Sequence, residues 1–152
     1  MHYIRFPVEL TDEAPAVFLA GGISNTEDWQ SVVAEELRSM AGAVINPRRD
    51  DYPDTETAAR EQIAWEFRHL QRADLFSFWF PPQTLCPIAL FELGAGCSSG
   101  VPLVVGADPE YTRRLDLLVQ LSLRRPEVVL VNSLPALVKQ IREHAVYQGT
   151  SR

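Results

Sequence analysis

The sequence predicts an α/β protein in which a five-stranded parallel sheet carries helices on both faces. Short apolar runs alternate along the chain with longer segments of helical periodicity, which is typical of such a sheet. The runs are continuously apolar, as expected of strands that are buried on both faces. A length of 152 residues suits one domain with its own core, so we expect a single domain over residues 1–152.

The first strand and the first helix are expected within the first 40 residues. Residues 17–20 form an apolar run that ends in the pair Gly21-Gly22, which indicates a buried strand followed by a tight turn. Residues 24–27 have the spacing of a capping box, and apolar side chains then recur at helical intervals as far as Met40. The sequence therefore predicts a helix that is capped at residues 24–27.

The second strand is expected at residues 43–45, because this apolar run stops at Asn46-Pro47. The polar loop after it leads into a helix over about residues 55–72. Helical spacing places Ile63, Phe67 and Leu70 on one side of this helix. We expect that side to face the core.

The third strand, at residues 74–80, is rich in aromatic residues and is closed by two prolines. A helix follows it and ends near residues 98–100. The same reading of apolar runs and helical spacing predicts the remaining elements in order: a strand at residues 101–105, a helix at 111–123, a strand at 128–131 and a helix at 135–146.

Glu92 is the only charged residue within residues 87–97. Burying an ionised carboxylate without partners is unfavourable and raises its pKa, and acids kept in such surroundings often serve chemistry. The alternative is a glutamate at the mouth of a core helix that reaches solvent or a backbone donor.

Five parallel strands suggest a flavodoxin-like (Rossmann-like) sheet of order 2-1-3-4-5, with the strands numbered along the chain. Ligands then bind beyond the carboxyl ends of strands 1 and 3, where the order reverses. The segments leaving those ends are Gly21-Gly22 and residues 81–92. This topology places Glu92 beside the expected crevice, and Gly21-Gly22 offers backbone N–H groups to a phosphate or a sugar hydroxyl.

Glu66 is a second candidate, on the flank of its helix together with Trp65 and His69. With Glu92 it would form a pair of carboxylates, which can divide the roles of nucleophile and proton donor in glycosidic bond cleavage. The alternative is an exposed glutamate that pairs with a neighbouring basic residue. Asp50 and Asp51 follow the second strand, where they either contact a substrate or belong to a solvated loop.

Composition excludes several classes of protein. The net charge is −6 and no basic block is present, which disfavours binding to a nucleic-acid polymer. Two cysteines without metal-ligand spacing predict neither a metal site nor a disulfide framework, and no cofactor motif is found. No signal peptide or membrane-spanning stretch is recognised, so we expect a cytoplasmic protein without a membrane partner.

Several segments in consistent order over residues 16–106 together resemble the nucleoside 2-deoxyribosyltransferase-like family. The wider superfamily also includes 2-deoxynucleoside 5-monophosphate N-glycosidases. The segments that carry the resemblance are Val17–Gly22, Asp28–Gln30, Asn46–Asp51, Gln62–Glu66 and Phe91–Gly94.

The resemblance implies a flavodoxin-like fold, a nucleoside or nucleotide substrate, and assembly into dimers or larger oligomers that help to complete the active site. It implies that Glu92 is the nucleophile, which attacks the anomeric carbon and releases the base. It also implies that Glu66 contacts the base, at a position where many members of the family carry aspartate.

Three features depart from that family. Phe18 occupies the position of an active-site tyrosine, so a hydroxyl that would orient Glu92 is missing. Cys86 stands six residues before the nucleophile, where transferases carry aspartate and monophosphate hydrolases carry serine to hold the sugar 5-position. The C-terminal third of the chain contains no segment that aligns.

The sequence therefore predicts an enzyme that cleaves the N-glycosidic bond of a nucleoside or a nucleoside 5-monophosphate through Glu92. The bond is then either hydrolysed or exchanged to another base. Because Cys86 is uncharged and leaves room for a 5-phosphate, a nucleotide-acting hydrolase is slightly favoured. The alternative is a nucleotide-sensing module of the same fold that does not turn over its ligand.

Overall fold

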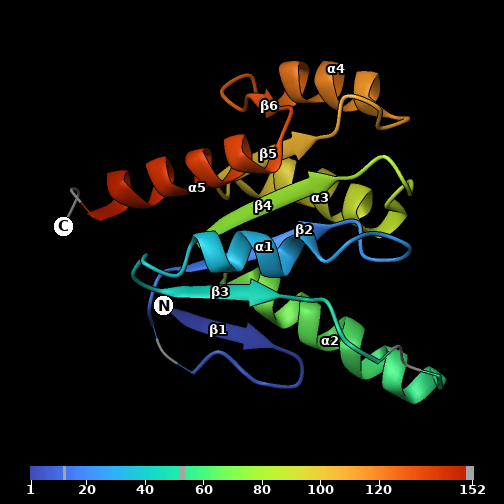
Figure 1. Ribbon diagram of the computed structural model, residues 1–152, viewed down its shortest axis with the longest axis vertical. Helices are drawn as coiled ribbons and strands as arrows, with labels where there is room; N and C mark the ends of the chain where they lie inside the picture. Colours follow the sequence, from blue (N-terminus) through green and yellow to red (C-terminus); the bar gives the residue numbers. More distant parts are fainter. Residues whose placement is uncertain (12, 52–53, 150–152) are drawn as a thin grey trace.

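The computed structural model describes residues 1–11, 13–51 and 54–149, and within them six parallel strands form one sheet of order β1-β3-β2-β4-β5-β6 (Figure 1). The order reverses between β2 and β4, which are the two central strands. The strands are β1 His2–Arg5, β2 Ala16–Gly21, β3 Ala43–Asn46, β4 Leu75–Phe80, β5 Leu103–Ala107 and β6 Leu130–Val131.

The α/β class and the parallel sheet are as predicted, but the prediction of five strands in the order 2-1-3-4-5 is wrong. The additional strand is β1, which pairs only with β3, at the edge of the sheet. It escapes detection because it is four residues long and only Ile4 in it is buried, so its sequence lacks a continuous apolar run. The other five strands keep the expected order among themselves.

Five helices of the described chain cover both faces of the sheet (Figure 1). Two separate apolar clusters show which helix covers which face: α1 and α5 pack on one side, and α2, α3 and α4 pack on the other. The helices are α1 Trp29–Glu36, α2 Glu56–Arg72, α3 Pro87–Ser99, α4 Arg114–Arg124 and α5 Leu134–Gly149.

Helix α1 is capped by Asp28, and not within residues 24–27 as predicted. The Asp28 carboxylate accepts hydrogen bonds from the backbone N–H of Ser31 at 3.1 Å and from its hydroxyl at 2.6 Å. The expected capping box fails because Asn25, which follows the expected cap Ser24, has a left-handed φ of 58° and cannot begin a helix. Thr26 instead donates its hydroxyl to carbonyls of the preceding turn, such as that of Ile23 at 3.1 Å.

Helix α2 packs on the sheet mainly through a different side from the one predicted, although Leu70 packs against the core as expected. Ile63 and Phe67 are 64% and 62% exposed, whereas Trp65 and His69 are each 1% exposed. Burial of His69 is possible because both ring nitrogens are satisfied: Nε2 accepts from the backbone N–H of Leu10 at 3.2 Å, and Nδ1 donates to the Trp65 carbonyl at 2.7 Å. Apolar spacing alone therefore selects the wrong face of this helix.

Candidate functional site

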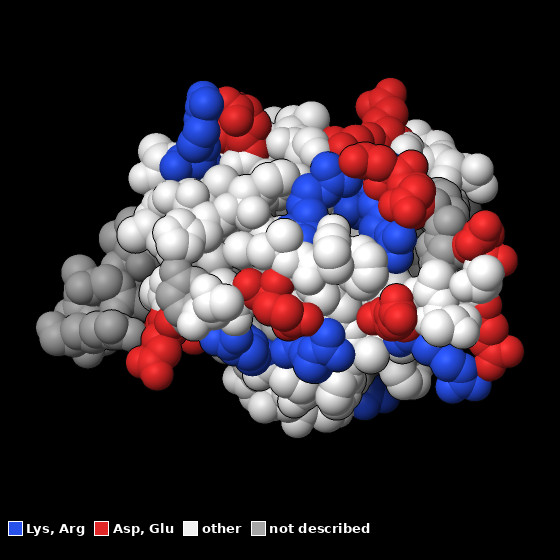
Figure 2. Space-filling view, turned by 90° about the horizontal axis from the view of Figure 1, so that it is seen from below, with Lys and Arg blue, Asp and Glu red and all other residues white. Residues whose placement is uncertain are grey.

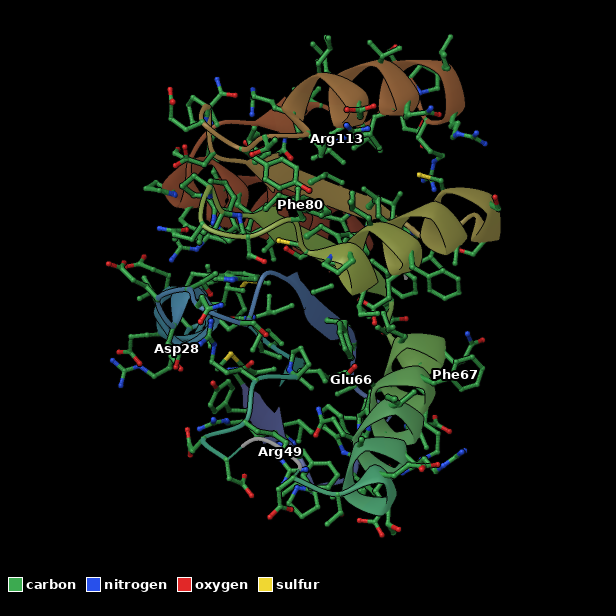
Figure 3. The ribbon with its side chains drawn as sticks, turned by 90° about the vertical axis from the view of Figure 1, so that its right-hand side faces the viewer. Asp28, Arg49, Glu66, Phe67, Phe80 and Arg113 are labelled. Atoms are coloured by element: carbon green, nitrogen blue, oxygen red, sulfur yellow. The ribbon has the colours of Figure 1, made fainter. Side chains whose placement is uncertain are left out.

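A cavity of about 260 Å³ opens beyond the carboxyl ends of β2 and β4, where the strand order reverses. Its walls come from the loop after β2, the loop after β4, the inner side of α2 and the first turns of α3. Figure 3 shows Glu66 on the inner side of α2 and Phe67 on the outer side of the same helix. The lining residues are Phe18, Ala20, Gly21, Gly22, Ile23, Ser24, Pro47, Glu66, Thr84, Cys86, Pro87, Ile88, Ala89 and Glu92.

The chain leaves β2 along one wall of the cavity because the last residue of the strand, Gly21, and the first residue of the loop, Gly22, are both glycines. Gly21 has a positive φ of 145°, and a Cβ there would lie 2.1 Å from the carbonyl oxygen of Trp79. The Gly22 carbonyl accepts hydrogen bonds from the indole N–H of Trp29 at 2.8 Å and from the hydroxyl of Thr26 at 3.2 Å. Glycine and these two donors hold the loop in place.

Arg48 ties the loop after β3 to the loop after β2. Its guanidinium donates to the Thr26 hydroxyl and the Glu27 carbonyl, both at 2.8 Å, and to the side-chain oxygen of Gln30 at 2.9 Å. Spacing does not predict this role, because the three acceptors lie about 20 residues away from Arg48 along the chain. Arg48 is therefore a structural support of the cavity rather than part of its lining.

The loop after β4 presents Cys86 to the cavity. Cys86 has left-handed backbone dihedrals (φ 52°, ψ 54°) and is 5% exposed, and its thiol donates to the Thr84 carbonyl at 3.4 Å. Burial raises the pKa of this thiol to about 11, so Cys86 is uncharged at neutral pH. The phenol of Tyr111 donates to the carbonyl of Leu85 at 2.7 Å and fixes the loop next to Cys86.

Glu66 and Glu92 both line the cavity, from α2 and α3 respectively. Burial raises the pKa of Glu66, although Glu66 Oε1 accepts a 2.6 Å hydrogen bond from the side-chain amide of Gln62. Burial, and secondarily the negative charge of Glu66, raise the pKa of Glu92 to about 8. Among the described residues no hydrogen-bond donor to Glu92 is found, and Phe18 and Ala89 contribute apolar surface to the same cavity.

The structure brings together six of the ten residues that the sequence analysis selected. These six are Phe18, Gly21, Gly22, Glu66, Cys86 and Glu92. The other four, Asp50, Asp51, Trp65 and His69, do not line the cavity.

Asp50 and Asp51 form ion pairs at the surface. Asp50 contacts Arg5 at 2.9 Å, and Asp51 contacts Arg49 at 2.9 Å, with both carboxylates largely exposed. On the face of the molecule seen in Figure 2, basic and acidic groups lie next to one another and not in separate patches. The loop charges are therefore balanced locally.

Trp65 and His69 lie on the core side of α2. Trp65 donates its indole N–H to the carbonyl of Val8 at 2.9 Å, and its ring lies 4.0 Å from the ring of His69. Because His69 also binds the backbone of Leu10, the two residues attach the segment after β1 to α2. Their contacts are those of structural residues.

The cavity offers two carboxyl groups and an uncharged thiol, and none of its described lining residues is Lys, Arg or His. Within the described chain, no three His, Cys, Asp or Glu side chains are grouped so that they could hold a metal ion. No helix in the same residues is both long and apolar enough to span a bilayer. The arrangement suits acid–base or nucleophilic chemistry by carboxyl groups on a small molecule.

The fold and the site define an α/β protein with a doubly wound parallel sheet and an acid-lined cavity at its switch point. The chain belongs to the nucleoside 2-deoxyribosyltransferase-like family, whose model matches residues 14–111. The matched region contains every residue that lines the cavity. A comparison with curated proteins gave no match.

Proposed function

We propose that this protein cleaves the N-glycosidic bond of a nucleoside or a nucleoside 5-monophosphate, with Glu92 as the nucleophile and Glu66 as the acid at the base. The observation that carries the proposal is that both carboxyl groups line one cavity at the switch point of the sheet. Membership of the family supports a nucleoside as the substrate.

The electrostatics of the cavity suit this reaction. Since Glu92 has a pKa of about 8 beside the charge of Glu66, the two carboxyls together hold about one proton near neutral pH. Cleavage needs one carboxylate to attack and one proton for the departing base. The pair supplies both once the proton that Glu92 carries in the free protein has passed to Glu66.

The bonds change in two steps. A carboxylate oxygen of Glu92 bonds to the anomeric carbon while the bond from that carbon to the base nitrogen breaks, and the base takes up the proton of the Glu66 carboxyl as it leaves. In hydrolysis, a water oxygen then bonds to the anomeric carbon, the ester bond to Glu92 breaks, and the released proton returns to the carboxyl pair. In base exchange, the nitrogen of a second base takes the place of water.

The sugar 5-position would lie at the Cys86 end of the cavity. Cys86 is uncharged, and the first turn of α3 supplies backbone N–H groups beside it, so a hydroxyl or a phosphate is compatible with this end. The absence of an aspartate there favours a monophosphate substrate slightly over a free nucleoside.

A ligand-sensing module is the second candidate, and a specific observation favours it. Phe18 lines the cavity with an apolar ring, and among the described residues no group donates a hydrogen bond to Glu92. Without a hydrogen-bond donor to orient its carboxylate, Glu92 would not act as a nucleophile, and the protein would bind its ligand without turnover. Catalysis and binding therefore have to be measured separately.

The deciding experiment incubates the protein with a panel of deoxynucleosides and nucleoside 5-monophosphates and measures released base by chromatography. We expect release by the wild type and at least a hundredfold less by Glu92→Gln, with Glu61→Gln, an exposed acid on α2, as the unchanged control. Binding of a nucleotide without release would overturn the enzyme and support the sensor. Adding a second base as acceptor separates transfer from hydrolysis.

We further propose that the protein forms a homodimer through the outer sides of α2 and α3. Ile63 and Phe67 on α2, and Ile88 and Phe91 on α3, are large apolar side chains that are exposed in the single chain. Ile88 also lines the cavity, so this apolar surface begins at the cavity mouth. A second copy seated there would shield Glu92 from water.

A further inference from the structure

Gln62, on α2, is a buried polar residue that makes three polar contacts, and the sequence analysis assigns it no role of its own. Its Nε2 donates to Glu66 Oε1 at 2.6 Å and to the Pro47 carbonyl at 3.0 Å, and its Oε1 faces Nη1 of Arg49 at 3.5 Å. These contacts fix the orientation of the amide, because the opposite orientation would place an oxygen against two acceptors.

The position of Gln62 explains how it reaches both sides of the cavity wall. It lies one helical turn before Glu66, so the two side chains are neighbours on the surface of α2. Pro47, in the loop after β3, lines the cavity together with Glu66. One amide therefore connects the loop to the acid.

We propose that Gln62 is a positioning residue, which fixes the carboxyl group of Glu66 in the cavity wall and stabilises its ionised form. The relevance of this role to catalysis rests on the proposed function, whereas the role itself is a property of the free protein. An N–H donor at 2.6 Å stabilises a carboxylate more strongly than a neutral carboxyl.

The other groups around Glu66 do not replace this donor. Glu92 and the uncharged thiol of Cys86 share the cavity with Glu66, and neither offers it a positive charge. Arg49 lies behind Gln62 and is paired with Asp51 at 2.9 Å. Burial raises the pKa of Glu66 and the hydrogen bond from Gln62 opposes that rise, so in the free protein Gln62 favours an ionised Glu66 and a protonated Glu92. Before Glu92 attacks, this proton has to pass from Glu92 to Glu66, beside the base.

The test is a titration of Glu66 in protein labelled with carbon-13 at the glutamate carboxyl, with the signal assigned through Glu66→Gln. Gln62→Met keeps the length of the side chain but removes both N–H donors, and we expect it to raise the pKa of Glu66 by about one to two units. Gln71→Met makes the same change at an exposed position of α2 and should leave the titration unmoved. An unchanged pKa in Gln62→Met would overturn the proposal.

The wild type supplies a second measurement that does not depend on the folding of a variant. The side-chain amide protons of Gln62 should shift with the same midpoint as the Glu66 carboxyl, because the two groups are hydrogen-bonded. Amide signals that do not follow the Glu66 titration would contradict the proposal.

An activity measurement then connects Gln62 to the reaction. In an enzyme that releases base, Gln62→Met should lower kcat about tenfold or more with a small change in KM, and should move one limb of the pH profile of kcat/KM. Gln71→Met should change neither. If the wild type releases no base, the proposed function fails and the titration alone decides the role of Gln62; if base is released but the titration is unmoved, only the role of Gln62 is wrong.

Discussion

Gly22 lies so close to Cys86 that a single added carbon atom would fill the space between them. A Cβ at Gly22 would lie 2.9 Å from the Cys86 sulfur and 2.6 Å from the ring of Pro81. All three residues belong to the loops that follow the two central strands, so their contact joins the two sides of the cavity. The absence of a side chain at Gly22 is therefore what allows the two loops to approach.

Gly22→Ala is expected to disturb the cavity. The new methyl group must displace Pro81 or Cys86, which we expect to cost about 1–3 kcal/mol of unfolding free energy and to weaken nucleoside binding. Thermal unfolding and calorimetric titration with a nucleoside measure the two effects.

Gly94→Ala is the matched comparison. A Cβ at Gly94 meets nothing within 4 Å, and the residue lies in the middle of α3. We expect alanine there to stabilise the protein by up to about 1 kcal/mol, because it restores helix propensity. Unchanged binding in both variants would show that the contact between the loops does not shape the site.

The sequence predicts most of the sheet, and its failures have physical reasons. Strands β2 to β5 are recognisable because burial on both faces requires continuous apolar runs, whereas β6 is a half-buried edge strand of two residues within the predicted apolar run 128–131. Strand β1 is an edge strand with one buried side chain, and its pairing with β3 depends on the folded structure. The face of α2 is misjudged because Gln62 and His69 become acceptable in the core only through partners distant in sequence, such as Leu10.

The residues of the candidate site also divide into those that the sequence reveals and those that only the folded structure reveals. Glu66 and Glu92 are recognisable because an acid among apolar residues is conspicuous, and the topology brings their helices to one crevice. Arg48 and Tyr111 support the cavity through contacts with residues more than 20 positions away, so no local pattern could identify them. Gln62 is four residues from Glu66, but its contact with Pro47, 15 positions away, is visible only in the folded protein.

The raised pKa of Glu92 predicts a dependence of stability on pH. In the unfolded chain the carboxyl ionises near its ordinary pKa of 4.5, whereas in the folded protein its pKa is about 8. Between these values the unfolded chain binds fewer protons, so the free energy of unfolding falls as pH rises, and the loss is complete above about pH 8.

Glu92→Gln removes this titration, so its stability relative to the wild type should increase as pH rises. The expected difference grows from small at about pH 5 to on the order of 3 kcal/mol at about pH 8.5. Thermal unfolding at intervals across that range measures it. A difference that is constant with pH would contradict burial of a Glu92 carboxyl with a raised pKa.

Tyr111→Phe tests whether the hydrogen bond from Tyr111 to the carbonyl of Leu85 fixes the loop that carries Cys86. Loss of the 2.7 Å hydrogen bond leaves the carbonyl of Leu85 without its donor, which we expect to cost about 1 kcal/mol and to lower the affinity for a nucleoside several-fold. Tyr3→Phe removes a phenol that accepts a 2.6 Å hydrogen bond from Asn46 on the β1 side of the sheet. It should reduce stability similarly and leave affinity unchanged; an equal loss of affinity in both variants would refute a local role for Tyr111.

The proposed homodimer predicts that a charge on the outer side of α2 or α3 dissociates the protein. Phe67→Glu and Phe91→Glu each place a carboxylate in a surface that would be desolvated between two copies, so we expect a shift to monomer in light scattering coupled to size exclusion. Leu123→Glu, on α4, changes a residue that is 75% exposed on a different part of the surface and should keep the wild-type mass.

If the second copy shields Glu92, the two dissociated variants should also lose base release at concentrations where the Leu123→Glu protein remains active. A monomeric wild type at about 100 μM, or dissociation by Leu123→Glu alone, would place the interface elsewhere or remove it.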